Sequence, residues 1–203
     1  MDEGTTGKIT PEIRETQNFP ETKIDNMILF YGASISGIKE LRRAEETTIG
    51  EGLYLTSQLE AAEGYAKRRA KINPESMPTV YQVEVSNLKM ADIRGSQALE
   101  TFAMKLKNRL QEERKKPNLP WYVQNAIVGT LERIDSKSYK SLRELAWNHQ
   151  EITTEVMRDE GFDGLIAQEG GEGDEIGDHD SYVIFDSTKA KVLKEVSLGI
   201  PHI

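Results

Sequence analysis

The chain has 203 residues and no cysteine, and 26 Lys and Arg stand against 34 Asp and Glu, which gives a formal net charge of −8. This acidic balance disfavours nucleic acid as a partner, because phosphate-driven binding requires a concentrated basic surface. The lack of cysteine excludes disulfides, thiolate metal sites and cysteine nucleophiles. The apolar fraction of 37% is sufficient for one hydrophobic core.

Residues 1–25 are rich in Thr, Glu, Gly and Pro without sustained periodicity, which predicts an N-terminal arm or leader. A basic, apolar signal peptide is not recognisable there, and no apolar run approaches the length of a membrane span. We therefore expect a single domain over 26–203 that does not act at a membrane and is cytoplasmic.

The first half of this domain alternates between strands and helices. The apolar run 27–31 ends at Gly32 and predicts a buried strand, and 36–41 has the pattern of a short helix. A brief extended segment over 53–56 precedes an alanine-rich helix over 58–71. Apolar and aromatic residues then alternate over 79–86, which predicts a strand with one buried face.

Three apolar stripes of helical period follow between about 96 and 160, and they predict three inserted helices. Strands return over 164–167, 181–186 and 191–196, separated by a glycine- and acid-rich stretch. Helices that are grouped apart from the strands predict an α+β fold with a mostly antiparallel sheet.

Three segments carry the chemistry: Phe30–Ser34 (FYGAS), Gly50–Ser57 (GEGLYLTS) with the helix after it, and Asp180–Asp186 (DSYVIFD). In this order they resemble the ADP-ribosyltransferase superfamily, in its diphtheria-toxin and poly-ADP-ribose-polymerase-like branch. That branch is marked by a histidine, a tyrosine and a glutamate on three separated strands. The resemblance covers roughly 27–94 and 160–196, and it implies a split sheet, NAD as co-substrate and an unmatched helical insertion at about 96–160.

The resemblance also implies roles for individual residues of the NAD site. Tyr31 and Gly32 stand at the family's histidine–glycine pair, which binds the adenosine ribose and the nicotinamide carboxamide. Tyr54 and Tyr65 are spaced like the two tyrosines that enclose the nicotinamide ring. Ser34 and Thr56, which follow these motifs directly, complete the predicted NAD-binding set.

The position of the family's catalytic glutamate is occupied by Ser181. A serine can hydrogen-bond a ribose, but it brings no negative charge to the cationic state that forms as nicotinamide leaves. Elongation of a poly-ADP-ribose polymer is therefore not expected. Transfer of a single ADP-ribosyl group requires another acidic residue. Asp180 is the first candidate, although within a strand it would point away from Ser181, and Glu169, Glu175 and Asp178 are the others.

Structural readings of the same residues stay open. Tyr54 and Tyr65 can be ordinary core aromatics, and the segment 174–180 can be a solvated acidic loop. No metal is expected there, because one histidine beside carboxylates does not match a known ligand spacing. His149 lies on an apolar helical stripe and is expected to be packed. The cations considered for the NAD diphosphate are Arg42, Arg43, Arg68 and Arg69.

The sequence thus predicts a NAD-dependent mono-ADP-ribosyltransferase that modifies a protein or, with less support, a nucleic acid. By analogy with the family, such an enzyme is a bacterial or phage effector or toxin that can be delivered into a host cell. The alternative is a catalytically degenerate module that binds NAD, ADP-ribose or a partner protein, and a scaffold that binds no nucleotide is a third reading.

Overall fold

Two long strands, β1 (Glu21–Ala33) and β3 (Thr79–Asp92), organise the sheet in the computed structural model, which describes residues 18–42, 47–72, 76–170 and 174–198. They pair in antiparallel register from Glu21 opposite Ala91 to Ala33 opposite Thr79. β3 continues well past residue 86, where the alternating pattern was expected to end, because it remains paired with β1 along its length.

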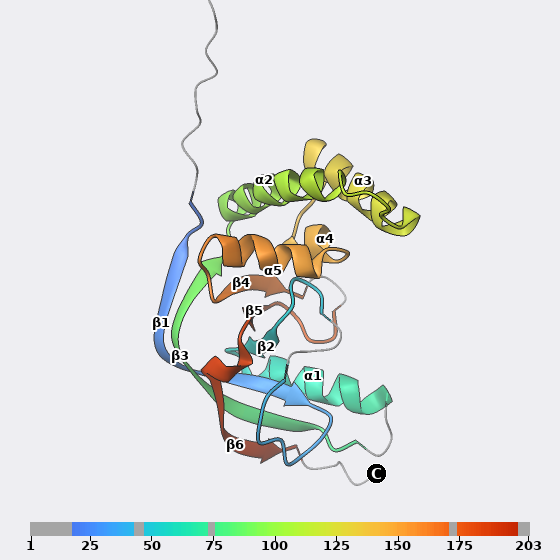
Figure 1. The fold of residues 1–203 in the computed structure, drawn as a ribbon. Helices are drawn as coiled ribbons and strands as arrows, with labels where there is room; N and C mark the ends of the chain where they lie inside the picture. Colours follow the sequence, from blue (N-terminus) through green and yellow to red (C-terminus); the bar gives the residue numbers. More distant parts are fainter. Residues whose placement is uncertain (1–17, 43–46, 73–75, 171–173, 199–203) are drawn as a thin grey trace, which may run out of the picture.

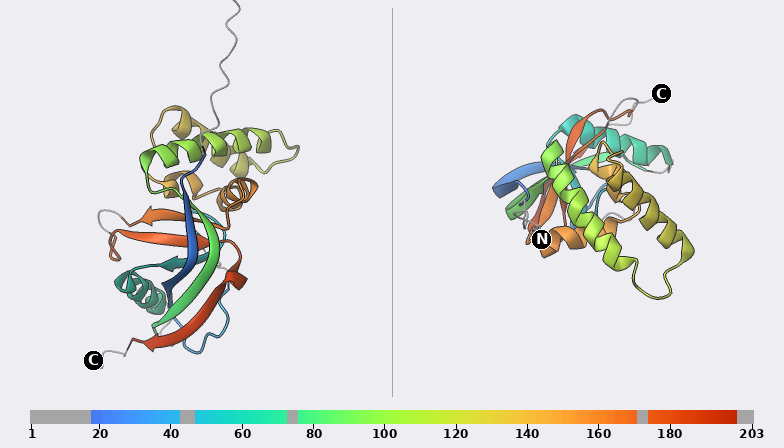
Figure 2. Two further views of the ribbon diagram at one scale, coloured as in Figure 1. Left: turned by 90° about the vertical axis from the view of Figure 1, so that its left-hand side faces the viewer. Right: turned by 90° about the horizontal axis from the view of Figure 1, so that it is seen from above.

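Four shorter strands complete a split sheet: β2 (Leu53–Thr56), β4 (Gly164–Glu169), β5 (His179–Ile184) and β6 (Ala190–Ser197). The order is β1-β2-β5-β4-β3-β6, and the β1–β3 pairing closes a circuit through the first five of these strands. On the edge of β3 that faces away from β1, the first half of the strand pairs with β6 and its end pairs with β4 (Figure 2). Among the strand pairings of the described residues, only β3–β4 is parallel, so the predicted mostly antiparallel sheet is confirmed.

The sheet begins inside the segment that the sequence assigned to an arm. β1 starts at Glu21, before the expected domain boundary at 25–26. Phe19 is buried and meets Phe162 edge to face, with the ring centroids 5.9 Å apart. Because this aromatic ring is buried, the chain belongs to the folded core from Phe19 onward. Residues 1–17 of the predicted arm lie outside the described residues.

The helix predicted over 36–41 is not formed, which corrects that prediction. Gly37 has a positive φ of 77°, and its N–H donates to the Glu195 carboxylate at 2.8 Å. The buried Tyr81 hydroxyl donates to the Ile35 carbonyl and accepts from the Ile38 N–H. A positive φ interrupts a right-handed helix, and these tertiary contacts hold residues 35–38 in a non-helical conformation.

Within the described ranges, five α-helices are formed, and a short 3-10 helix (Ser187–Lys189) precedes β6. The α-helices are α1 (Leu59–Ile72) between β2 and β3, then α2 (Ser96–Glu113), α3 (Trp121–Asp135), α4 (Leu142–Ala146) and α5 (Gln150–Asp159) between β3 and β4. The third predicted helix is divided in two at His149, which has non-helical backbone angles. As expected, this histidine is packed: it is buried and lies 3.0 Å from the Thr130 hydroxyl. Burial lowers the pKa of His149, which favours the neutral ring.

The helical insertion shares one core with the sheet. Phe102, Leu106 and Met157 from the helices belong to the same buried cluster as Leu165 of β4 and Val183 of β5. Figure 1 shows α2–α5 at one end of the sheet, with α1 packed on the other part. This shared core holds α4 beside β4, where it contributes to the cleft described below. Within the described ranges, none of the helices has the length and apolar character that a membrane crossing requires.

Gly32 at the end of β1 is required by close packing against α1. A Cβ at this position would lie 2.1 Å from the Ala62 carbonyl oxygen and 2.9 Å from the Ala66 nitrogen, and both are backbone atoms. We expect Gly32→Ala to lower the free energy of unfolding by about 1–3 kcal/mol or more. Chemical denaturation measures this change.

Gly129→Ala is the matched control, because Gly129 is a glycine of α3 with open space around it. Here alanine should stabilise by about 0.5–1 kcal/mol through helix propensity. Equal effects of the two substitutions would contradict the packing of α1 on Gly32.

Candidate active site

A cleft opens where β1, β2 and β5 meet α1 and α4. It contains about 740 Å³ of space, part of which is continuous with open solvent. The predicted residues that line it are Tyr31, Gly32, Tyr54, Thr56, Tyr65 and Ser181. Segments from the two halves of the resemblance are therefore brought together in one cavity.

Strand register explains this convergence. Thr56 of β2 is opposite Ser181 of β5, and Glu169 of β4 is opposite His179. Because alternate residues of a strand share a face, the side chains of Glu169, Ser181 and Thr56 lie on the same side of the sheet, together with Tyr54. This face forms the floor of the cleft.

Glu169 brings a buried carboxylate into contact with Ser181. It is only 8% exposed, and its two oxygens accept hydrogen bonds from the Ser181 hydroxyl at 2.5 Å and the Thr48 hydroxyl at 2.7 Å. A buried carboxylate requires such donors to offset its desolvation. The sequence had named Glu169 among several acids near this loop, and the diagonal relation across β4 and β5 brings it to the site.

Asp180 does not lie in the cleft, which corrects its assignment as a catalytic residue. It is the second residue of β5 and therefore points to the opposite face from Ser181. Its carboxylate accepts from the Arg94 guanidinium at 2.5 Å, and the same guanidinium also pairs with Asp92. Ser34 is also outside the lining of the cleft, since it follows β1 in the bend after Ala33.

Tyr54 contributes its ring to the cleft while its hydroxyl organises the preceding loop. The hydroxyl accepts from the N–H groups of Thr48, Ile49 and Gly50 at 2.9–3.1 Å and donates to the Gly50 carbonyl at 2.7 Å. Burial raises the pKa of this phenol, so it stays protonated. These hydrogen bonds fix the loop in the position from which the Thr48 hydroxyl donates to Glu169.

Tyr65 comes from α1 and forms another wall of the cleft. Its hydroxyl lies 3.0 Å from Nε2 of His179, and the two rings meet edge to face at 5.4 Å. Burial, followed by the charge of Glu169, raises the pKa of Tyr65. Both aromatic side chains that the resemblance assigned to the nicotinamide pocket are thus neutral, partly buried residues of this cleft.

Three arginines line the cleft, two from α1 and one from the insertion: Arg68, Arg69 and Arg143. Arg69 donates to the Gly32 carbonyl at 2.8 Å and to the Tyr31 hydroxyl at 3.3 Å, and its guanidinium lies 5.6 Å from the Tyr31 ring centre. Arg68 is 3.9 Å from Asp174. Among the described residues, neither Arg69 nor Arg143 forms an ion pair with a carboxylate.

The arginines that line the cleft differ from the sequence prediction at Arg42 and at Arg143. Of its four candidates, Arg68 and Arg69 reach the cleft, Arg42 is not among the lining residues, and Arg43 lies outside the described residues. Arg143 was missed because it belongs to the insertion, which has no counterpart in the resemblance. A lone Arg in a short helix carries no motif, so only tertiary structure could reveal it.

The acidic segment before β5 is not a freely solvated loop over the part that the structure describes, 174–178. Asp174 lines the cleft, and His179 is buried at the start of β5. Glu175 is exposed and pairs with Lys71 of α1 at 3.2 Å. Residues 171–173 of this segment lie outside the described residues. Within the described ranges, no group of three or more His, Asp or Glu side chains has an arrangement suited to a metal ion.

Comparison with models of known protein families gives no match, and no curated protein sequence matches the chain. Among solved structures, a chain from the crystal structure of the M. tuberculosis MbcT–MbcA toxin–antitoxin complex is similar, with a TM-score of 0.46 and 12% sequence identity. The similarity covers 87% of this chain and 86% of that chain. At this level of likeness it does not bear on the chemistry of the cleft.

Tyr54→Phe tests the role of the Tyr54 hydroxyl. The variant keeps the ring but leaves three backbone N–H groups and one carbonyl without their partner. We expect the free energy of unfolding to fall by about 1–3 kcal/mol. Tyr122→Phe is the control, since Tyr122 is 63% exposed and should change stability little. Equal stability of both variants in urea denaturation would contradict the role of this hydroxyl.

Proposed function

We propose that the protein is a NAD-dependent mono-ADP-ribosyltransferase acting on a protein acceptor, with Glu169 as its catalytic carboxylate. The observation that carries this proposal is the 2.5 Å hydrogen bond from Ser181 to the buried Glu169. It puts a negative charge directly beside the position at which the resembling family has its glutamate. In this proposal the acidic residue, Glu169, lies on the neighbouring strand β4 and not at position 181 of β5. The site therefore keeps its negative charge.

The reaction gives this charge a defined task. The bond between the ribose C1 and the nicotinamide nitrogen breaks, and nicotinamide leaves as a neutral molecule with the bonding electron pair. Positive charge then develops on the ribose, and a carboxylate beside it lowers the energy of this state. The acceptor forms the new bond to C1 and gives up its proton. Ser181 and Thr48 hold the carboxylate in place through their hydroxyl groups.

The remainder of the cleft matches the two chemically different parts of NAD. Tyr54 and Tyr65 offer aromatic surfaces for a planar ring, as a nicotinamide site requires. The three lining arginines offer planar, charged donors for a diphosphate. In this proposal Tyr31 and Thr56 contact the riboses, and the Gly32 backbone bonds the carboxamide.

A second hollow adjoins the cleft and shares Glu169 and Gly170 with it. Its other lining residues include Arg94, Lys140 and Leu142. We assign the approach of the acceptor to this side, because Glu169 lines both hollows. The net charge of −8 favours a protein over a nucleic acid acceptor.

Because Tyr31 and Ser181 stand where the resembling family has a histidine and a glutamate, one alternative function remains. It is a degenerate module that binds NAD or ADP-ribose without turnover. The two functions differ in one measurement. Tight NAD binding without release of nicotinamide would support the module and overturn the enzyme.

Glu169→Gln tests the catalytic role directly. The amide has the size of the carboxylate but no charge, so we expect nicotinamide release from NAD to fall about 100-fold or more. Glu175→Gln is the matched control, since Glu175 belongs to the adjacent segment, is exposed and lies outside the lining of the cleft. Thermal denaturation of both variants separates lost chemistry from lost folding. A folded Glu169→Gln variant with unchanged turnover would contradict the assignment.

Arg143→Gln tests the diphosphate site. Loss of one charge-assisted contact should raise the Kd for NAD about tenfold or more, measured by isothermal titration calorimetry. Arg114→Gln removes an exposed arginine outside the cleft and should leave the Kd unchanged. If both variants bind NAD as the parent protein does, the phosphates do not contact the insertion.

A further inference from the structure

We infer that His179 is a positioning residue that fixes the ring of Tyr65 in the nicotinamide pocket and connects it to the segment 174–178. The consequence for NAD rests on the proposed function, whereas the contact between the two side chains does not. His179 was expected in a solvated loop, and the structure instead buries it, with only 2% of the residue exposed.

The hydrogen-bond directions follow from the chemistry of the partners. Nδ1 of His179 lies 2.9 Å from the Gly177 carbonyl oxygen, which can only accept, so Nδ1 carries the ring proton. Nε2 of the neutral ring is then an acceptor, and the Tyr65 hydroxyl donates to it at 3.0 Å. The chain of contacts therefore runs from the Tyr65 O–H through His179 to the backbone of Gly177.

Two further features hold the Tyr65 ring in one orientation. Its plane is nearly perpendicular to the imidazole, at 79°, so the histidine edge limits rotation of the phenol. Burial and the nearby Glu169 raise the pKa of Tyr65, which keeps the hydroxyl protonated as a donor. A fixed ring presents its face to a bound nicotinamide without an additional loss of side-chain entropy.

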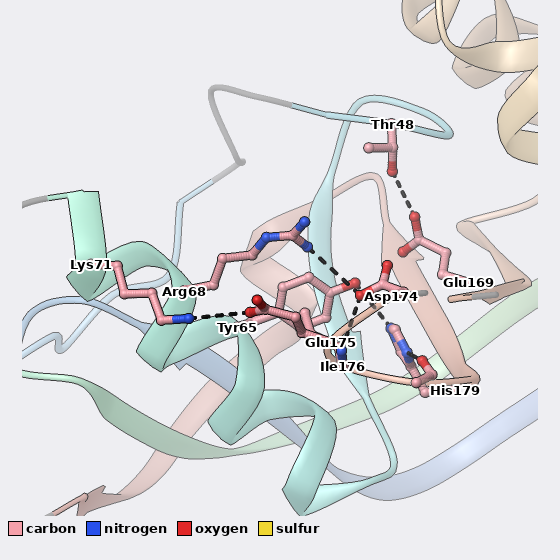
Figure 3. Close-up of polar contacts among 10 residues, drawn as sticks. Thr48, Tyr65, Arg68, Lys71, Glu169, Asp174, Glu175, Ile176 and His179 are labelled. Carbon is pink, nitrogen blue, oxygen red and sulfur yellow. Dashed lines mark hydrogen bonds and ion pairs between the residues drawn. The ribbon is translucent and has the colours of Figure 1, made fainter. Parts of the chain in front are cut away.

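The segment before His179 is fastened to the same helix as Tyr65 (Figure 3). Ile176 packs on Gly64, where an added Cβ would lie 3.1 Å from the isoleucine Cγ1. Beyond this contact, Asp174 faces Arg68 at 3.9 Å, and Glu175 pairs with Lys71. Gly64, Arg68 and Lys71 succeed one another at helical spacing, so the segment lies along one side of α1. His179 is the point at which this segment contacts the aromatic wall of the cleft.

A matched pair of substitutions separates positioning from mere packing. His179→Phe keeps an aromatic ring but removes the acceptor, and His179→Gln keeps a carbonyl oxygen at about the place of Nε2. We expect His179→Phe to raise the Kd and the KM for NAD about three- to tenfold with a smaller change in kcat, and His179→Gln to restore most of the affinity. Equal losses in both folded variants would overturn the positioning role.

The Tyr65→Phe background completes the test. Without the phenol O–H, His179→Phe and His179→Gln should bind NAD equally, because the hydrogen bond that distinguishes them is absent. A difference that persists in this background would show that His179 acts by another route, and would also overturn the inference.

Nitrogen NMR of the histidine rings tests the contact without NAD. We expect His179 to be the neutral tautomer with the proton on Nδ1, and its signal is assigned by its loss in His179→Gln. A proton on Nε2 would overturn the inference even if the enzyme is active. Conversely, the expected tautomer in a protein that neither binds nor consumes NAD would leave the contact intact and place the failure in the proposed function.

Discussion

The register of β2, β5 and β4 is the constraint on which the candidate site depends. It puts Thr56, Ser181 and Glu169 on one face of the sheet, and a shift of one residue would turn each of these side chains to the other face. Such a shift would exchange Glu169 for Gln168 and Ser181 for Asp180, which bonds Arg94 outside the cleft. The position of the acid is therefore a property of strand pairing more than of any local motif.

This register is supported by groups at some distance from the acid. The Tyr54 hydroxyl fixes the backbone of 48–50, and that loop delivers the Thr48 hydroxyl to Glu169. Ser181 occupies the other carboxylate oxygen from the opposite side. A buried charge with two short hydrogen bonds is held more rigidly than an exposed one, and rigid placement is what electrostatic stabilisation of a developing charge requires.

Charge in the cleft is arranged with both signs present. Its lining includes the acidic residues Glu169 and Asp174 and the cationic residues Arg68, Arg69 and Arg143. The cationic residues come from α1 and from α4 in the insertion. The insertion thus supplies part of the cleft wall, and its shared core with β4 and β5 fixes that wall relative to the sheet.

The fold class could be predicted from hydrophobic periodicity, and the resemblance of the spaced motifs to a known family implied the convergence of Tyr31, Tyr54, Tyr65 and Ser181. The helix expected over 36–41 is not formed, because Gly37 has a positive φ and the backbone of 35–38 is held by Tyr81 and Glu195, which are distant in sequence.

The acidic residue of the cleft could be predicted only as one of several candidates, since the choice between Asp180 and Glu169 depends on strand register. Arg143 and the environment of His179 depend on tertiary packing, which leaves no local pattern in the sequence.

The proposed function requires that the cleft between Tyr54, Tyr65 and Glu169 receives the nicotinamide end of NAD. Saturation-transfer NMR on a mixture of the protein and NAD tests this most directly, because ligand protons near protein side chains receive the strongest transfer. We expect strong transfer to the nicotinamide ring protons, and we expect Tyr65→Ala to reduce this transfer greatly. Transfer confined to the adenine protons, or no transfer to NAD at all, would contradict it.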